Sequence, residues 1–160
     1  MIRLVRPEDA EALCQIYNHY IHETVISFEE EPVTAAEMQE RICLITASHP
    51  WLVFERNEQI LGYAYAGYWE ERSAYRLSAK AAIYLDKEAI GQGIGKQVYG
   101  KLIDLLRQQG RKTVLGGIAL PNPGSVALHE SLGFKKVAHY EQLGFKQGRW
   151  IDVGYWQLKL

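Results

Sequence analysis

An apolar segment followed by a glycine-rich loop and an amphipathic helix constrains the fold more than any other part of the chain. Residues 81–85 are apolar, glycines occupy alternate positions from 91 to 95, and apolar residues recur every three or four positions over 94–106. This spacing predicts a strand, a loop and a helix that Gly110 ends. Glycines let the backbone approach a ligand closely, and the free N–H groups at a helix N-terminus attract anions. We therefore expect a phosphate-binding loop here, with a glycine-rich turn that binds nothing as the alternative.

Two common nucleotide-binding motifs do not match this loop. The dinucleotide pattern Gly-x-Gly-x-x-Gly would need its third glycine at Lys96. The Walker pattern would need a glycine at Ile90 and a serine or threonine at Gln97. The loop therefore predicts a phosphate ligand of another kind.

Shorter patterns predict the elements on either side. Alternating apolar residues, turn residues and capping signals predict the order strand, two helices, three strands, helix, strand, helix and two strands, which is a mixed α/β class. We expect Ser125 to cap the last helix, residues 121–124 to be neither helix nor strand, and residues 144–148 to connect the last two strands. The strands are expected at residues 2–6, 51–56, 60–69, 76–85, 113–119, 134–141 and 151–159, and the other helices begin near residues 7 and 34.

Composition limits the partners and the compartment. With 160 residues and a net charge of -1, the chain suits one domain, residues 1–160, and lacks the basic surface that nucleic-acid binding requires. Cys14 and Cys43 fall in predicted helices without partner spacing, which predicts buried, reduced thiols. The chain shows no signal peptide or membrane span, and its histidines lack metal-ligand spacing. We therefore expect a cytoplasmic protein with no nucleic-acid, membrane or metal partner.

The glycine loop and several other strings resemble the GCN5-related N-acetyltransferase (GNAT) superfamily. Its pyrophosphate pattern, Arg/Gln-x-x-Gly-x-Gly/Ala, places Gly93 and Gly95 on its small residues but puts Ile90 where the family has a polar side chain. Within the superfamily, the chain is similar to the branch that acetylates phosphinothricin and methionine sulfoximine or sulfone. The matching strings include Ile-Tyr-Asn-His-Tyr-Ile at 16–21, Gly-Tyr-Ala-Tyr-Ala-Gly at 62–67, Arg-Ser-Ala-Tyr-Arg at 72–76, Leu-His-Glu-Ser-Leu-Gly-Phe at 128–134 and Gly-Arg-Trp-Ile-Asp-Val-Gly at 148–154.

This resemblance implies a GNAT fold, with helices on both faces of a central, mostly antiparallel twisted sheet. It also implies direct transfer from acetyl-CoA to the amine of a small amino-acid-like acceptor in a ternary complex, a homodimer, and a part in herbicide or antibiotic resistance. Asn122 and Ser125 would contact the cofactor arm, although a bond within its own turn is the alternative for Asn122. The resemblance assigns the pantetheine amides to Ile83, Tyr84 and Leu85, and the pyrophosphate to Gly91, Gln92, Gly93, Ile94, Gly95 and Lys96.

The position of the catalytic base departs from the branch. Its members carry a glutamate proposed to deprotonate the acceptor, whereas this chain has Lys80, and a lysine at its ordinary pKa of about 10.4 cannot accept that proton. Three accounts are open: a depressed lysine pKa, an anion-binding Lys80 with proton removal by water or another group, or a weak or lost activity. We favour the second, because Arg76 and Lys80 would share one strand face as a cationic pair. A lysine that simply extends to water is the plain alternative.

The remaining candidates are an aromatic, two loop residues and a histidine. Phe28 is a candidate for the acceptor pocket wall, and Arg72 and Tyr75 lie on a loop that approaches the acceptor in the branch. His129 holds the position from which many acetyltransferases protonate the leaving CoA thiolate, and packing is the alternative for it. The missing glutamate also leaves two other functions open, which are acetylation of a different small amine and CoA sensing without catalysis.

Overall fold

The computed structural model describes residues 1–160 and has the element order predicted from the sequence. The helices are α1 Ala10–Glu23, α2 Ala35–Thr46, α3 Ile94–Gln108 and α4 Pro123–Ser131. The strands are β1 Ile2–Leu4, β2 Trp51–Arg56, β3 Gln59–Tyr68, β4 Ser78–Leu85, β5 Thr113–Leu120, β6 Lys135–Lys146 and β7 Arg149–Lys159. None of the helices is long and apolar enough to cross a membrane.

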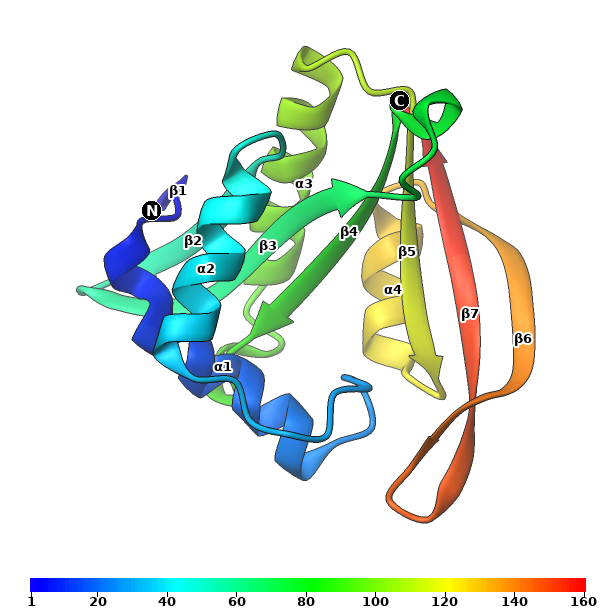
Figure 1. The fold of residues 1–160 in the computed structure, drawn as a ribbon, viewed down its shortest axis with the longest axis horizontal. Helices are drawn as coiled ribbons and strands as arrows, with labels where there is room; N and C mark the ends of the chain where they lie inside the picture. The colour runs from blue at the N-terminus through cyan, green and yellow to red at the C-terminus, as the bar shows by residue number, and fades with distance from the viewer.

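The strands form one seven-stranded sheet in the order β1-β2-β3-β4-β5-β7-β6. Every neighbouring pair is antiparallel except β4 and β5, which are parallel. Helices α1 and α2 cover one face of the sheet, and α3 and α4 cover the other (Figure 1). This arrangement confirms the expected mixed α/β class with a mostly antiparallel sheet.

The parallel pair separates part of the way along its length. Its register pairs only residues 78–80 of β4 with residues 113–115 of β5, and the two strands then diverge (Figure 1). Residues 81–85 remain paired with β3 but have no strand partner on their other side. The sheet therefore has an open seam in its middle, edged by backbone that an extended ligand can pair with.

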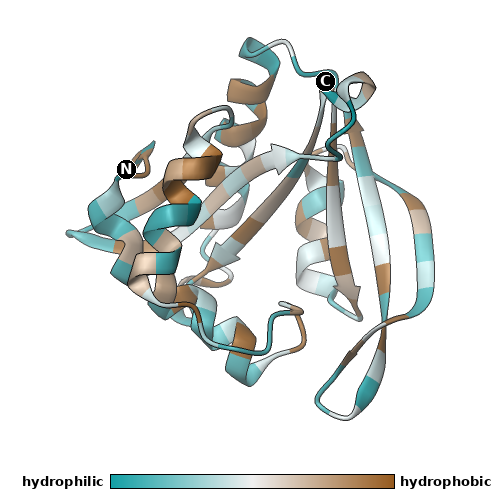
Figure 2. Ribbon diagram, in the orientation of Figure 1, coloured by the Kyte–Doolittle hydropathy of each residue, from teal (hydrophilic) through white to brown (hydrophobic).

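A separate apolar core lies on each face of the sheet. Fifteen buried residues pack between α3 and the sheet, with Leu102 and Trp156 among them, and 14 pack beneath α1 and α2, including Leu13 and Trp51. The ribbon is mostly brown along β4, whereas β6 and β7 carry more teal and white (Figure 2). The seam therefore lies between two packed apolar layers.

Two predicted boundaries near the seam were wrong. Strand β4 begins at Ser78, because Arg76 ends the 3-10 turn Ser73–Tyr75 and its guanidinium Nη1 donates to the Ser73 carbonyl at 3.2 Å. Helix α4 begins at Pro123, because proline suits a first helical turn and the Asn122 side chain, in place of Ser125, caps the helix.

The connection between the last two strands is also shorter than expected. Strand β6 runs through Lys146, and a two-residue turn at Gln147 and Gly148, with φ of +52° and +74°, leads into β7. Gly144 therefore lies within a strand, where a Cβ would stand 2.4 Å from the Phe28 ring. The glycine makes room for an aromatic side chain and does not form a turn.

One of the two cysteine predictions was wrong, because Cys43 lies on the exposed side of its helix. Cys14 is buried as predicted, whereas Cys43 is exposed. Met38 and Ile42 form the buried side of α2. Cys43 follows Ile42 directly, so the helical turn of about 100° per residue places its side chain outside that buried side.

Candidate active site

A cavity of about 460 Å³ lies beside the open seam. Its walls come from β3, β4, β5 and β7, with Phe28 and Ile26 from the loop after α1 and Leu143 from β6. Eleven of its 14 lining residues are hydrophobic, and Lys80 is the one that carries a charge. A ligand here meets mostly apolar surface and a single cation.

Lys80 is placed at this cavity as predicted, but its neighbours differ from the prediction. Its ammonium Nζ lies 3.5 Å from the Tyr155 hydroxyl and 5.6 Å from the centroid of that ring. The Trp69 ring packs edge-on against Tyr155, with centroids 5.6 Å apart. Because no carboxylate pairs with Lys80, its charge is free to attract an anion.

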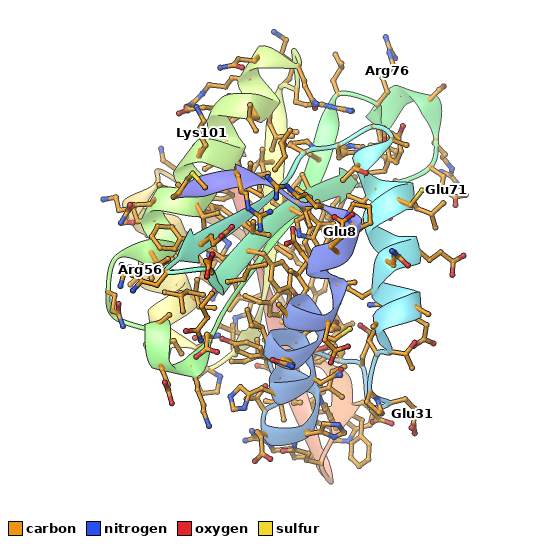
Figure 3. All side chains as sticks on the ribbon, turned by 90° about the vertical axis from the view of Figure 1, so that its left-hand side faces the viewer. Glu8, Glu31, Arg56, Glu71, Arg76 and Lys101 are labelled. Atoms are coloured by element: carbon orange, nitrogen blue, oxygen red, sulfur yellow. The ribbon has the colours of Figure 1, made fainter.

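The predicted cationic pair is absent. Arg76 projects away from the body of the molecule, clear of the cavity (Figure 3). Arg72 and Tyr75 also lie outside the cavity wall, whereas Phe28 forms part of it. Of the predicted acceptor contacts, this chain therefore brings only Phe28 and Lys80 together.

The start of α3 forms the predicted anion cradle. Gly93 is the N-cap with φ of +75°, Gly91 has φ of +83°, and no side chain caps the first turn. The first hydrogen bond of the helix runs from Gln97 N–H, so the N–H groups of residues 94–96 have no partner within the helix. A Cβ added at either of these two glycines would meet nothing within 4 Å. The cradle is therefore open to a pyrophosphate, and its residues suit that group.

Two side chains near the cradle, those of Gln92 and Ile90, add little to it. The Gln92 amide is held elsewhere, because its Oε1 accepts from Arg56 and its Nε2 donates to the Glu88 carbonyl at 2.8 Å. Ile90, which replaces a polar side chain of the GNAT pattern, is 60% exposed. Neither of these two side chains therefore reinforces the free backbone N–H groups of residues 94–96.

The seam edge of β4 is partly in use. The Leu85 carbonyl accepts a hydrogen bond from the Tyr20 hydroxyl at 2.6 Å. Ile83 has no strand partner toward β5, and Tyr84 is one of the residues that line the cavity. Of the three strand residues predicted to pair with pantetheine, Leu85 therefore has one group already occupied.

His129 lies in the core beneath β5. It is 3% exposed, its Nδ1 bonds the Ser125 carbonyl at 2.8 Å, and its Nε2 accepts from the Tyr99 hydroxyl at 3.1 Å. Burial lowers the pKa of His129, so the neutral imidazole is favoured. A Cβ at Gly116 would lie 2.5 Å from this ring, which shows how closely β5 rests on it. Of the two roles considered for His129, packing accounts for all these contacts.

The structure contains the alternative contact considered for Asn122, a hydrogen bond within its own turn. Its Oδ1 accepts from the Ser125 backbone N–H at 3.2 Å, which is a bond within its own turn. A contact from Asn122 or Ser125 to the cofactor arm stays a prediction.

One part of the site escaped the sequence reasoning. Tyr155 reaches the cavity because it lies opposite Gly117 in the β5–β7 ladder, a register that the sequence does not specify.

Together the open seam, the glycine cradle and the adjoining cavity define a transferase that holds an extended, phosphate-bearing acyl donor beside a small acceptor. A family model described as an acetyltransferase (GNAT) domain matches residues 2–154, and the chain belongs to this family.

Known relatives and a solved structure show which branch of the family the chain is similar to. The chain is 37% identical to a phosphinothricin N-acetyltransferase of Streptomyces viridochromogenes, covering 98% of this chain and 85% of the relative. It is 32% identical to an L-methionine sulfoximine/L-methionine sulfone acetyltransferase of Salmonella typhimurium, covering 99% and 94%. A phosphinothricin acetyltransferase from Sinorhizobium meliloti in complex with acetyl-CoA superposes with a TM-score of 0.96 at 34% identity, covering 100% of this chain and 88% of the other. Both the superfamily and the branch inferred from the sequence are confirmed.

Proposed function

We propose that this chain is an acetyl-CoA-dependent N-acetyltransferase that acts on small amino-acid-like acceptors of the phosphinothricin and methionine sulfoximine type. The observation that carries the proposal is the seam between β4 and β5, which leads from the glycine cradle to the cavity. Relatives named for these acceptors match nearly the whole chain. The volume of the cavity suits an acceptor of amino-acid size.

The chain itself would act mainly by positioning the reactants. Bound acetyl-CoA would supply a thioester whose carbonyl carbon accepts the amine. The N–H groups of residues 94–96 would hold the pyrophosphate, and the free backbone edge at Ala81 and Ile83 would align the pantetheine arm. The apolar cavity walls would exclude water from the reacting atoms. Holding both reactants in this way supplies much of the rate enhancement in a direct transfer.

Lys80 would bind an anionic group of the acceptor. It is the single charge on the cavity wall, and the Tyr155 hydroxyl beside it offers a second donor to a carboxylate or phosphinate. An acceptor with one anionic end, an apolar middle and an amine would therefore match the wall. A different small amine of that shape remains the second candidate function, for the same reason.

The deciding experiment measures CoA thiol release with a panel of acceptors and acetyl-CoA binding by calorimetry. We expect release with phosphinothricin, methionine sulfoximine or methionine sulfone. Release with another amine alone would move the acceptor assignment. Binding of acetyl-CoA without release from any acceptor would refute the enzymatic proposal and favour a CoA sensor.

We also propose that the chain forms a homodimer through its β6–β7 edge. Phe145 and Trp150 are 57% and 58% exposed there, and their rings pack together with centroids 5.2 Å apart. Leu143 and Val137 add exposed apolar surface on the same edge strand. Light scattering should give twice the monomer mass, and Trp150→Glu should shift it to the monomer; a monomeric parent chain would contradict the proposal.

A further inference from the structure

One side wall of the cavity is built from two chain segments that are far apart in the sequence. Ile26 and Phe28 come from the loop between α1 and α2, and Leu143 comes from β6. Both segments lie at the end of the sheet where β4 and β5 have separated (Figure 1). The size of the cavity therefore depends on how this loop is held against β6.

Ser27, which stands between the two wall residues of the loop, is buried and fixed from two sides. Its Oγ lies 2.9 Å from the Tyr17 hydroxyl of α1. Its backbone carbonyl accepts a hydrogen bond from Lys146 Nζ of β6 at 2.6 Å. Because Ile26 and Phe28 flank Ser27 in the chain, the anchoring of Ser27 also places both of these wall residues.

Lys146 is the one lysine of the chain that is buried, at 4% exposure. Burial lowers the pKa of Lys146, while the carboxylates of Glu29 and Glu30 favour its charged form. A buried ammonium group costs free energy unless it is hydrogen-bonded, and a bond from a charged donor is stronger than one between neutral groups. The acceptor that satisfies Lys146 is the Ser27 carbonyl, so the loop is tied to β6 at this point.

The Phe28 ring forms a second contact between the loop and β6. A Cβ added at Gly144 would lie 2.4 Å from this ring, so the ring rests directly on the backbone of the strand. The Gln147 side chain adds two longer bonds, to the His22 and Thr24 carbonyls at 3.4 Å. The ring therefore keeps a fixed place on the cavity wall as long as the loop stays against β6.

We propose that Lys146 is a positioning residue that sets the upper size limit of the acceptor, because it holds the loop of Ile26 and Phe28 against β6. This inference rests on the acetyltransferase function proposed above and adds a specificity determinant that lies outside the cavity lining. With the loop held, the cavity of about 460 Å³ suits an acceptor of the size of methionine sulfone. With the loop released, the wall yields to a bulkier side chain.

The test compares Lys146→Met with the parent chain on a small and a bulky acceptor. Methionine keeps a long apolar stem but cannot donate to the Ser27 carbonyl. We measure kcat/KM with methionine sulfone and with tryptophan. The fit of a single methylene group in an apolar pocket is worth about 10- to 200-fold in kcat/KM. The preference for methionine sulfone should therefore fall by about tenfold or more in Lys146→Met, and calorimetry should show unchanged affinity for acetyl-CoA.

Two further variants and one physical measurement accompany this comparison. Gly144→Ala displaces the Phe28 ring from β6 and leaves Lys146 in place, so it should also change the preference between the two acceptors. Lys135→Met removes the same charge from the exposed start of the same strand and should leave the preference unchanged. Backbone hydrogen exchange over residues 24–33 should be faster in Lys146→Met than in the parent. Thermal melts establish that each variant is folded.

The outcomes separate the role of Lys146 from the proposed function. If the parent transfers acetyl groups and Lys146→Met keeps the parent's preference, the role of Lys146 is wrong and the function stands. A loss of rate that is equal for both acceptors would make Lys146 purely structural and would also overturn the inference. Unchanged hydrogen exchange in the loop would show that Lys146 does not hold it, whether or not the chain is active. A parent that transfers to no amine would refute the proposed function, and the size limit would fail with it.

Discussion

Replacing Lys80 with methionine tests whether the cavity recognises an anion. Methionine keeps a long apolar stem and removes the charge, so the wall of the cavity changes little in shape. In the parent, the ammonium stands 3.5 Å from the Tyr155 hydroxyl without a carboxylate partner. The charge is therefore available to an acceptor, and its loss should weaken acceptor binding.

The magnitude follows from the exposure of the lysine. Two unit charges about 4 Å apart attract by about 1 kcal/mol in water and about 4 kcal/mol near a protein surface. Lys80 is exposed at the cavity rim, which places its contribution toward the lower end, at about 1–2 kcal/mol. That range corresponds to a rise of about 5- to 30-fold in acceptor KM.

The assay uses two acceptors that differ in one group. Steady-state kinetics are measured with an amino-acid acceptor and with its carboxamide, for the parent, Lys80→Met and Lys80→Arg. We expect the parent and Lys80→Arg to prefer the carboxylate and Lys80→Met to lose that preference. An unchanged preference in Lys80→Met would refute the anion-binding account. A higher turnover in Lys80→Glu, with Lys80→Met unchanged, would show instead that the site lacks a base.

Three further predictions concern packing, pH and thiol reactivity. His129→Gln should destabilise the fold by about 2 kcal/mol, because buried hydrogen bonds are lost, and change kcat by less than about threefold; a fall in kcat of about 100-fold would restore its acid role. Burial lowers the pKa of His49 from 6.5 to about 4. The free energy of unfolding should therefore decline by up to about 3 kcal/mol as the pH falls from 6.5 to about 4. Urea titrations should show this decline in the parent and not in His49→Phe. Because Cys43 is exposed and Cys14 is buried, one thiol should react quickly with Ellman's reagent and the other only on unfolding, whereas two slow thiols would contradict this.

Local patterns predicted the elements and the cradle because neighbouring residues determine them. The capping box Thr34–Glu37 marks the start of α2, and the apolar repeat over α3 marks its buried face. The glycines at 91 and 93 adopt the positive φ that other residues rarely take, so their presence in the sequence already indicated the loop conformation. The sequence also showed the lysine at position 80, since it is a plain departure from a known pattern.

Boundaries near turns were harder to predict because several conformations suit the same residues. The alternation of polar and apolar residues continues back to Arg76, so the sequence allowed β4 to start there. Arg76 instead ends a 3-10 turn. Glycine is common in turns, so the sequence suggested a turn at Gly144. Only the Phe28 ring packed against it explains a glycine within β6.

The sequence by itself determined the fold class, the acyl-donor loop and the loss of the usual base, because each rests on residues close together in the chain. The tertiary structure alone decided what surrounds Lys80. Tyr155 and Trp69, which lie 75 and 11 positions from Lys80 in the chain, meet beside its ammonium group. Such neighbours are brought together by strand register and by helix packing on the sheet, which no local pattern encodes.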